Sequence, residues 1–88
     1  MKTETEIAKD NVRSLKDTEG SSNILTTILR TEMKSHLQSC QRFLWYLQAP
    51  MSNFMNLNGK CFRIMNNKIK DLQNAIKIYE DAGIKWTN

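Results

Sequence analysis

Residues 24–48 read ILTTILRTEMKSHLQSCQRFLWYLQ and decide the fold class, because they contain neither proline nor glycine and are followed by Ala49-Pro50. Proline cannot continue a helix, so this stretch predicts a single helix of about 25 residues and about 37 Å. From residue 33 onward, its apolar positions are spaced 4-3-4-3. This is a seam with a period of 3.5, typical of helices that pack side by side, formed by Met33, Leu37, Cys40, Leu44 and Leu47.

A second long helix is predicted over 60–82. Its apolar positions are spaced 3-4-3-4-3 and form a matching seam, made of Phe62, Met65, Ile69, Leu72, Ile76 and Tyr79. Gly83 suits the left-handed position that follows a helix, and Ile84 is placed to pack back on Tyr79. We therefore expect this helix to end in a Schellman motif.

A short helix is predicted over 4–17. Thr3 and Glu6 have the spacing of a capping box, in which the Thr3 hydroxyl accepts the Glu6 N–H and the Glu6 carboxylate returns to the Thr3 N–H. A weak apolar stripe follows at helical spacing, formed by Ile7, Ala8, Val12 and Leu15. Between residues 51 and 59 the pattern is ambiguous, because Asn58-Gly59 favours a turn. An extra helical turn over 52–57 is one interpretation of this segment.

These elements predict an all-α protein. Two long helices with matching seams and a short connection form an antiparallel helical hairpin, and the short N-terminal helix covers part of it. A chain of 88 residues has room for one domain, 1–88, whose core is marginal on its own. We therefore expect the hairpin to pack into a bundle within an oligomer.

The composition excludes several protein classes. With 40% hydrophobic and 25% charged residues, the chain is globular rather than disordered. No run of 18 apolar residues is present, so no membrane span is expected. Residues 1–10 are charged throughout and do not resemble a signal peptide, which leaves the cytoplasm as the expected location. Two cysteines are too few for a secreted disulfide framework, and Cys40 and Cys61 are interpreted as small packing residues.

No catalytic residue, cofactor or metal site is expected from the sequence. His36 and Cys40 stand four residues apart on one helix face, but a zinc site needs about four ligands and only Cys61 is available as a further soft donor. No acidic residue is spaced to orient His36 as a base, and the three glycines are isolated rather than clustered in a phosphate loop. The sequence therefore predicts that the protein is not an enzyme.

The end of the first long helix is the strongest functional clue. Successive residues on a helix point about 100° apart, so an apolar run of five residues covers almost its whole circumference. One neighbouring helix cannot cover every side of such a run. We expect a partner or oligomer interface here, formed by Phe43, Trp45, Tyr46 and Leu47.

A basic stripe on the second long helix provides an alternative. Arg63, Lys70 and Lys77 lie on the face opposite the apolar seam, interleaved with Asn67 and Asn74. Lys and Arg can contact phosphates, and Asn can reach base edges. A charged outer face is also what any half-buried helix needs in order to stay soluble. The main hypothesis is a non-enzymatic interaction protein, a small self-associating helical bundle that acts as an adaptor, inhibitor or regulatory subunit. The alternative is a nucleic-acid or nucleotide-phosphate binder that uses this stripe.

Overall fold

The protein is all-helical in the part that can be described. The computed structural model describes residues 2–18, 23–48 and 59–85, and these ranges contain three α-helices and no β-strand. The predicted all-α class is therefore confirmed. The interpretation of 52–57 as an extra helical turn concerns residues that lie outside the described ranges.

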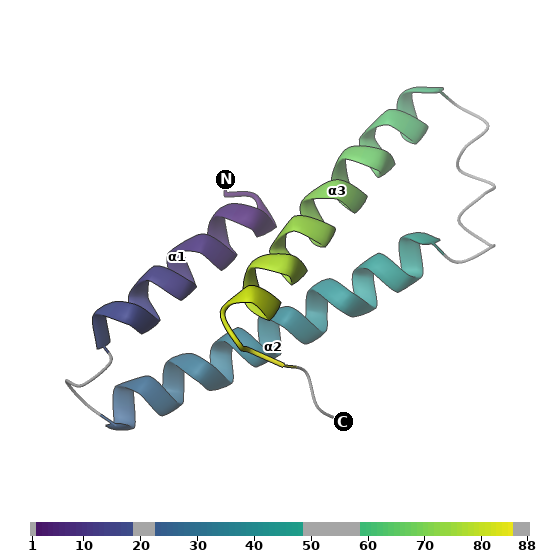
Figure 1. Cartoon of the computed structure of the whole chain (residues 1–88). Helices are drawn as coiled ribbons and strands as arrows, with labels where there is room; N and C mark the ends of the chain where they lie inside the picture. The colour runs from purple at the N-terminus through teal and green to yellow at the C-terminus, as the bar shows by residue number, and fades with distance from the viewer. Residues whose placement is uncertain (1, 19–22, 49–58, 86–88) are drawn as a thin grey trace.

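Each helix boundary lies within one residue of the sequence prediction. The predicted helices were 4–17, 24–48 and 60–82; the observed helices are α1 (Glu4–Thr18), α2 (Asn23–Gln48) and α3 (Gly59–Asp81). Each helix contacts the other two. In Figure 1, α1 lies beside the first half of α2, and α3 runs at an angle to α2 so that its C-terminal end reaches the middle of α2.

The core lies where the three helices meet. α2 contributes the predicted seam. This seam is buried at Met33, Leu37 and Cys40 and half-buried at Leu44 and Leu47. α1 contributes Ala8 and Leu15, so its weak apolar stripe is docked against the other helices. The buried residues are Ala8, Leu15, Met33, Leu37, Cys40, Leu72, Ala75, Tyr79 and Ile84.

Both predicted helix caps are present. At the start of α1, the Thr3 hydroxyl accepts the Glu6 N–H at 3.2 Å, and the Glu6 carboxylate accepts the Thr3 hydroxyl at 3.4 Å, where the sequence predicted the Thr3 N–H. At the end of α3, the Gly83 N–H bonds to the Glu80 carbonyl and the Ile84 N–H to the Tyr79 carbonyl. With a φ of 81° at Gly83, these bonds form the complete Schellman motif.

Within the described residues, no helix combines the length and the apolar character that crossing a membrane requires.

Candidate functional site

The polar site at the junction of the helices begins with Asp71, which holds the first turn of α1. Its carboxylate accepts the Glu4 N–H at 3.0 Å, the Thr5 N–H at 2.9 Å and the Thr5 hydroxyl at 2.7 Å. The first N–H groups of a helix have no partner within the helix, so a side chain of α3 here provides the cap that α1 needs. The start of α1 is thereby fixed against α3.

The same contacts lower the pKa of Asp71. Burial alone would raise it, but the Thr5 hydroxyl, the two backbone N–H groups and the nearby Lys68 amine together favour the carboxylate and bring the pKa below its usual value. Lys68 lies 3.7 Å from Asp71 and 3.5 Å from Glu4. Asp71 is therefore a charged anchor between α1 and α3.

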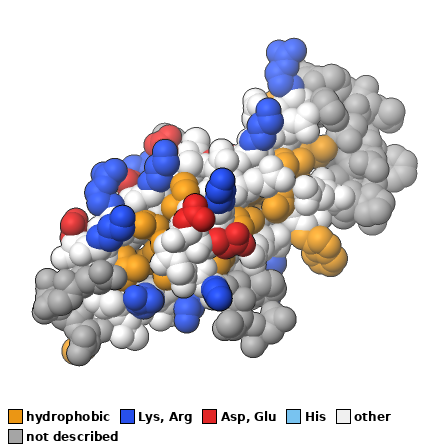
Figure 2. All heavy atoms as spheres, in the orientation of Figure 1, with side chains coloured by type: hydrophobic (Ala, Val, Ile, Leu, Met, Phe, Trp, Pro, Cys, Tyr) orange, Lys and Arg blue, Asp and Glu red, His pale blue; other side chains and the backbone are white. Residues whose placement is uncertain are grey.

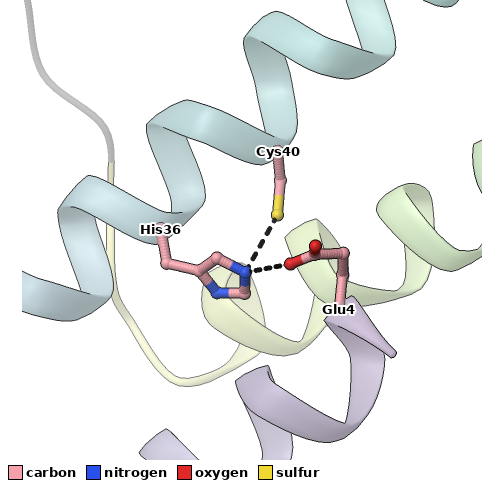
Figure 3. Close-up of side chains that lie close together, drawn as sticks. All are labelled: Glu4, His36 and Cys40. Atoms are coloured by element: carbon pink, nitrogen blue, oxygen red, sulfur yellow. Dashed lines mark hydrogen bonds and ion pairs between the residues drawn. The ribbon is translucent and has the colours of Figure 1, made fainter. Parts of the chain in front are cut away.

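Because Asp71 fixes the start of α1, the Glu4 side chain is directed at His36 of α2. A Glu4 carboxylate oxygen (Oε2) contacts His36 Nε2, and the two side chains point toward each other from different helices (Figure 3). On the other side of the ring, His36 Nδ1 lies 2.5 Å from the Tyr79 hydroxyl of α3. One histidine thus joins all three helices.

The Tyr79 hydroxyl extends the contacts of His36 back to α1. Asn11 Nδ2 donates to the Tyr79 oxygen at 3.0 Å, and the same hydroxyl group hydrogen-bonds to His36 Nδ1. Glu4, His36, Tyr79 and Asn11 thus form one hydrogen-bonded network across the three helices. A polar network of this kind stabilises a fold when its groups are paired with one another.

Cys40 completes the cluster from one turn further along α2. Its Sγ lies 3.5 Å from His36 Nε2, the same nitrogen that contacts Glu4 (Figure 3). Burial, assisted by the Glu4 charge, raises the pKa of the Cys40 thiol to about 11. A hollow of about 100 Å³ adjoins the three side chains and is also lined by Phe43 and Leu72.

This arrangement differs from that of a nucleophile, base and acid in a catalytic triad. In a triad, the base uses one ring nitrogen for the nucleophile and the other for the acid. Here Cys40 and Glu4 share Nε2, and Nδ1 is taken by Tyr79. A raised thiol pKa also keeps Cys40 protonated rather than activated.

A second candidate site is the aromatic end of α2. Phe43, Trp45 and Tyr46 are 46%, 78% and 68% exposed, whereas Leu47 is half-buried and packs against the core with Leu44. Phe43 also lies beneath the Lys68 amine, 5.7 Å from its ring centre. Of the four predicted interface residues, three therefore face outward and Leu47 lies on the inner side of the helix.

The predicted basic stripe is the third candidate. Arg63, Lys70 and Lys77 are all exposed, and no ion pair involves any of them within the described ranges. Figure 2 shows one face of the molecule, on which Lys and Arg side chains project around a band of hydrophobic side chains. The stripe is thus accessible, and it lies apart from the cluster around His36.

The polar cluster is the part of the site that the sequence did not predict in full. The sequence showed that His36 and Cys40 lie four residues apart on one helix. It offered Cys61 as a third donor, and the side chain of Cys61 is not among those that the structure describes. The actual third group is Glu4, 32 residues away from His36 in the chain. An acidic residue in the first turn of a helix is explained by its favourable interaction with the helix dipole. Nothing in the sequence near Glu4 therefore predicted its contact with His36.

Comparison with known proteins gives no relative for this chain. No protein-family model, no curated protein and no solved structure matches it.

Proposed function

We propose that this protein is a non-enzymatic interaction protein, a small self-associating helical bundle that acts as an adaptor, inhibitor or regulatory subunit. In this proposal, α2 and α3 form an antiparallel hairpin, α1 covers one side of it, and a second copy of the chain covers the aromatic end of α2. The observation that carries the proposal is the exposure of Phe43, Trp45 and Tyr46 at that end.

Three aromatic side chains within four residues expose a large apolar surface, and covering this surface would be energetically favourable. Fully burying one such side chain contributes about 1.5–3 kcal/mol. The net stability of a small domain is only about 5–15 kcal/mol, so covering this patch would add a substantial fraction of it. Trp, Tyr and Arg are also the residues enriched at protein interfaces, and Arg42 adjoins the patch.

The patch has a shape that suits a second copy of the same chain. Ser39, Arg42, Phe43 and Tyr46 line a shallow hollow of about 470 Å³ on α2. Trp45 projects beside it, about 100° around the helix from Tyr46. A two-fold axis would place each Trp45 against the hollow of the other chain, so that both aromatic patches are covered at once.

Sedimentation equilibrium of the full chain at micromolar concentration tests this proposal. We expect about twice the chain mass for the wild type and a shift toward monomer for Trp45→Ala. Ile24→Ala is the control, because Ile24 is 73% exposed but lies at the opposite end of α2, and this variant should stay dimeric. A strictly monomeric wild type, or equal dissociation of both variants, would contradict the proposal.

The alternative is a nucleic-acid or nucleotide-phosphate binder, and the accessibility of Arg63, Lys70 and Lys77 is the observation that favours it. Neutralising phosphates releases counterions, so affinity for a DNA or RNA duplex should fall steeply with salt. Replacing all three residues with Gln should abolish such binding and leave the helical content unchanged. Binding that survives this triple change, or that does not depend on salt, would count against the stripe.

A reducing location such as the cytoplasm suits either proposal, because Cys40 is a buried free thiol in this fold.

A further inference from the structure

We propose that Glu4, His36 and Cys40 bind a zinc ion, which links α1 to α2 at the junction of the three helices. The three side chains present an oxygen, a nitrogen and a sulfur donor, and their ligating atoms all lie within 4.8 Å of one another. This proposal is independent of self-association, since all three residues come from one chain.

The distances already approach those of a zinc centre. Zinc bonds of about 2.0–2.3 Å in a tetrahedral arrangement place neighbouring ligand atoms about 3.3–3.8 Å apart. His36 Nε2 and Cys40 Sγ are 3.5 Å apart, and Glu4 Oε2 is in contact with the same nitrogen. The Glu4 oxygen and the His36 nitrogen would have to move apart by about 1 Å to reach the separation that two zinc ligands require.

The surroundings of the ligands are those that a bound metal requires. Metal-binding histidines usually hydrogen-bond through the second ring nitrogen, which fixes the orientation of the ring. Here that partner is the fully buried Tyr79, which is itself held by Asn11. Lys68 lies near the other oxygen of Glu4 (Oε1) and leaves Oε2 directed at His36.

Room for a fourth ligand is also present. The hollow of about 100 Å³ beside Glu4, His36 and Cys40 exceeds the roughly 10–15 Å³ that a cavity needs to hold one water molecule. Three protein ligands plus one water is the arrangement of open zinc sites. Phe43 and Leu72 supply the apolar part of its lining.

The donor set favours zinc over the common hard cations. Mg²⁺ and Ca²⁺ prefer oxygen ligands, whereas thiolate and imidazole suit zinc. The protons balance as follows: the metal replaces the Cys40 thiol proton, which passes to solvent. His36 binds the metal through a bare Nε2, with its one ring hydrogen on Nδ1, where it donates to the Tyr79 oxygen; the ring therefore neither gains nor loses a proton.

Competition with a chromophoric chelator, using untagged full-length protein, measures the predicted binding. We expect one Zn²⁺ per chain, and binding that excess Mg²⁺ does not displace. Glu4→Gln and Cys40→Ala should each weaken Zn²⁺ binding at least about tenfold, since even changes to outer groups cost that much. Glu80→Gln is the control, because it removes an exposed carboxylate of α3 outside the cluster.

Cobalt substitution provides a second measurement, which does not depend on comparing the metal affinities of the variants. Co²⁺ bound to a thiolate gives a sulfur-to-metal charge-transfer band, which should appear in the wild type and be absent from Cys40→Ala. Circular dichroism verifies that each variant is folded. The proposal is wrong if the folded wild type takes up no Zn²⁺, if binding survives both ligand changes, or if the Co²⁺ form lacks the sulfur band.

Discussion

Asp71 illustrates how one side chain can position an entire helix. It lies on α3, yet it accepts hydrogen bonds from the first two residues of α1, 67 and 66 positions away in the chain. A carboxylate at a helix N-terminus is favoured both by the unpaired N–H groups and by the helix dipole. Without it, the start of α1 and the Glu4 side chain would lose their fixed place opposite His36.

Asp71→Ala should therefore lower the free energy of unfolding by about 1–2 kcal/mol, the usual cost of a lost cap that leaves buried donors unsatisfied. The folded-state pKa of Asp71 is lowered. Its stabilising effect should thus be complete above the unfolded value of about 3.9 and be lost as the pH falls below it. Urea unfolding of both proteins between pH 7 and pH 2 measures this. A difference that stays constant down to pH 2 would contradict the assignment.

At the scale of elements, the features that were predicted from the sequence are those encoded by nearby residues. The seam of α2 was predictable because burial repeats with the helical period, and Met33, Leu37 and Cys40 are indeed buried. The Schellman motif was predictable because Gly83 and Ile84 lie within a few residues of their partners. Helix caps and seams are local patterns, so one sequence is sufficient to predict them.

Gly83→Ala tests how much the end of α3 depends on backbone conformation. At a φ of 81°, a side chain is strained, but a Cβ placed there meets no atom within 4 Å. The loss should therefore come from the backbone alone, about 1 kcal/mol of unfolding free energy. Gly83→Asn is the matched variant and should lose less, because Asn tolerates left-handed conformations. Equal losses in thermal unfolding would show that another factor determines the cost.

At the scale of the whole molecule, the polar cluster could not be predicted, because it depends on how the helices are rotated and offset. Glu4, His36 and Tyr79 come from three different helices, and their meeting point is set by packing contacts between residues far apart in the chain. The sequence predicted which face of each helix is apolar, but not which polar side chains would meet at the edge of that face. Conversely, the interface predicted at the aromatic end of α2 came from a local argument about the helix circumference and stays a prediction, although Trp45 is 78% exposed there.

If two chains associate through the aromatic end of α2, thermal stability must depend on protein concentration. Association of folded chains but not of unfolded ones stabilises the folded state by mass action. Each tenfold increase in concentration adds about 1.4 kcal/mol per dimer. For two chains of 88 residues that unfold together, this corresponds to a rise in Tm of about 3–6 °C.

Calorimetry or circular dichroism over a hundredfold range of concentration would measure this rise. Trp45→Ala should have a Tm that is lower and nearly independent of concentration, because the side chain that fills the hollow of the other copy is removed. Ile24→Ala should keep the wild-type dependence, since Ile24 lies at the other end of α2. A wild-type Tm that does not change with concentration would mean that the folded monomer is sufficient.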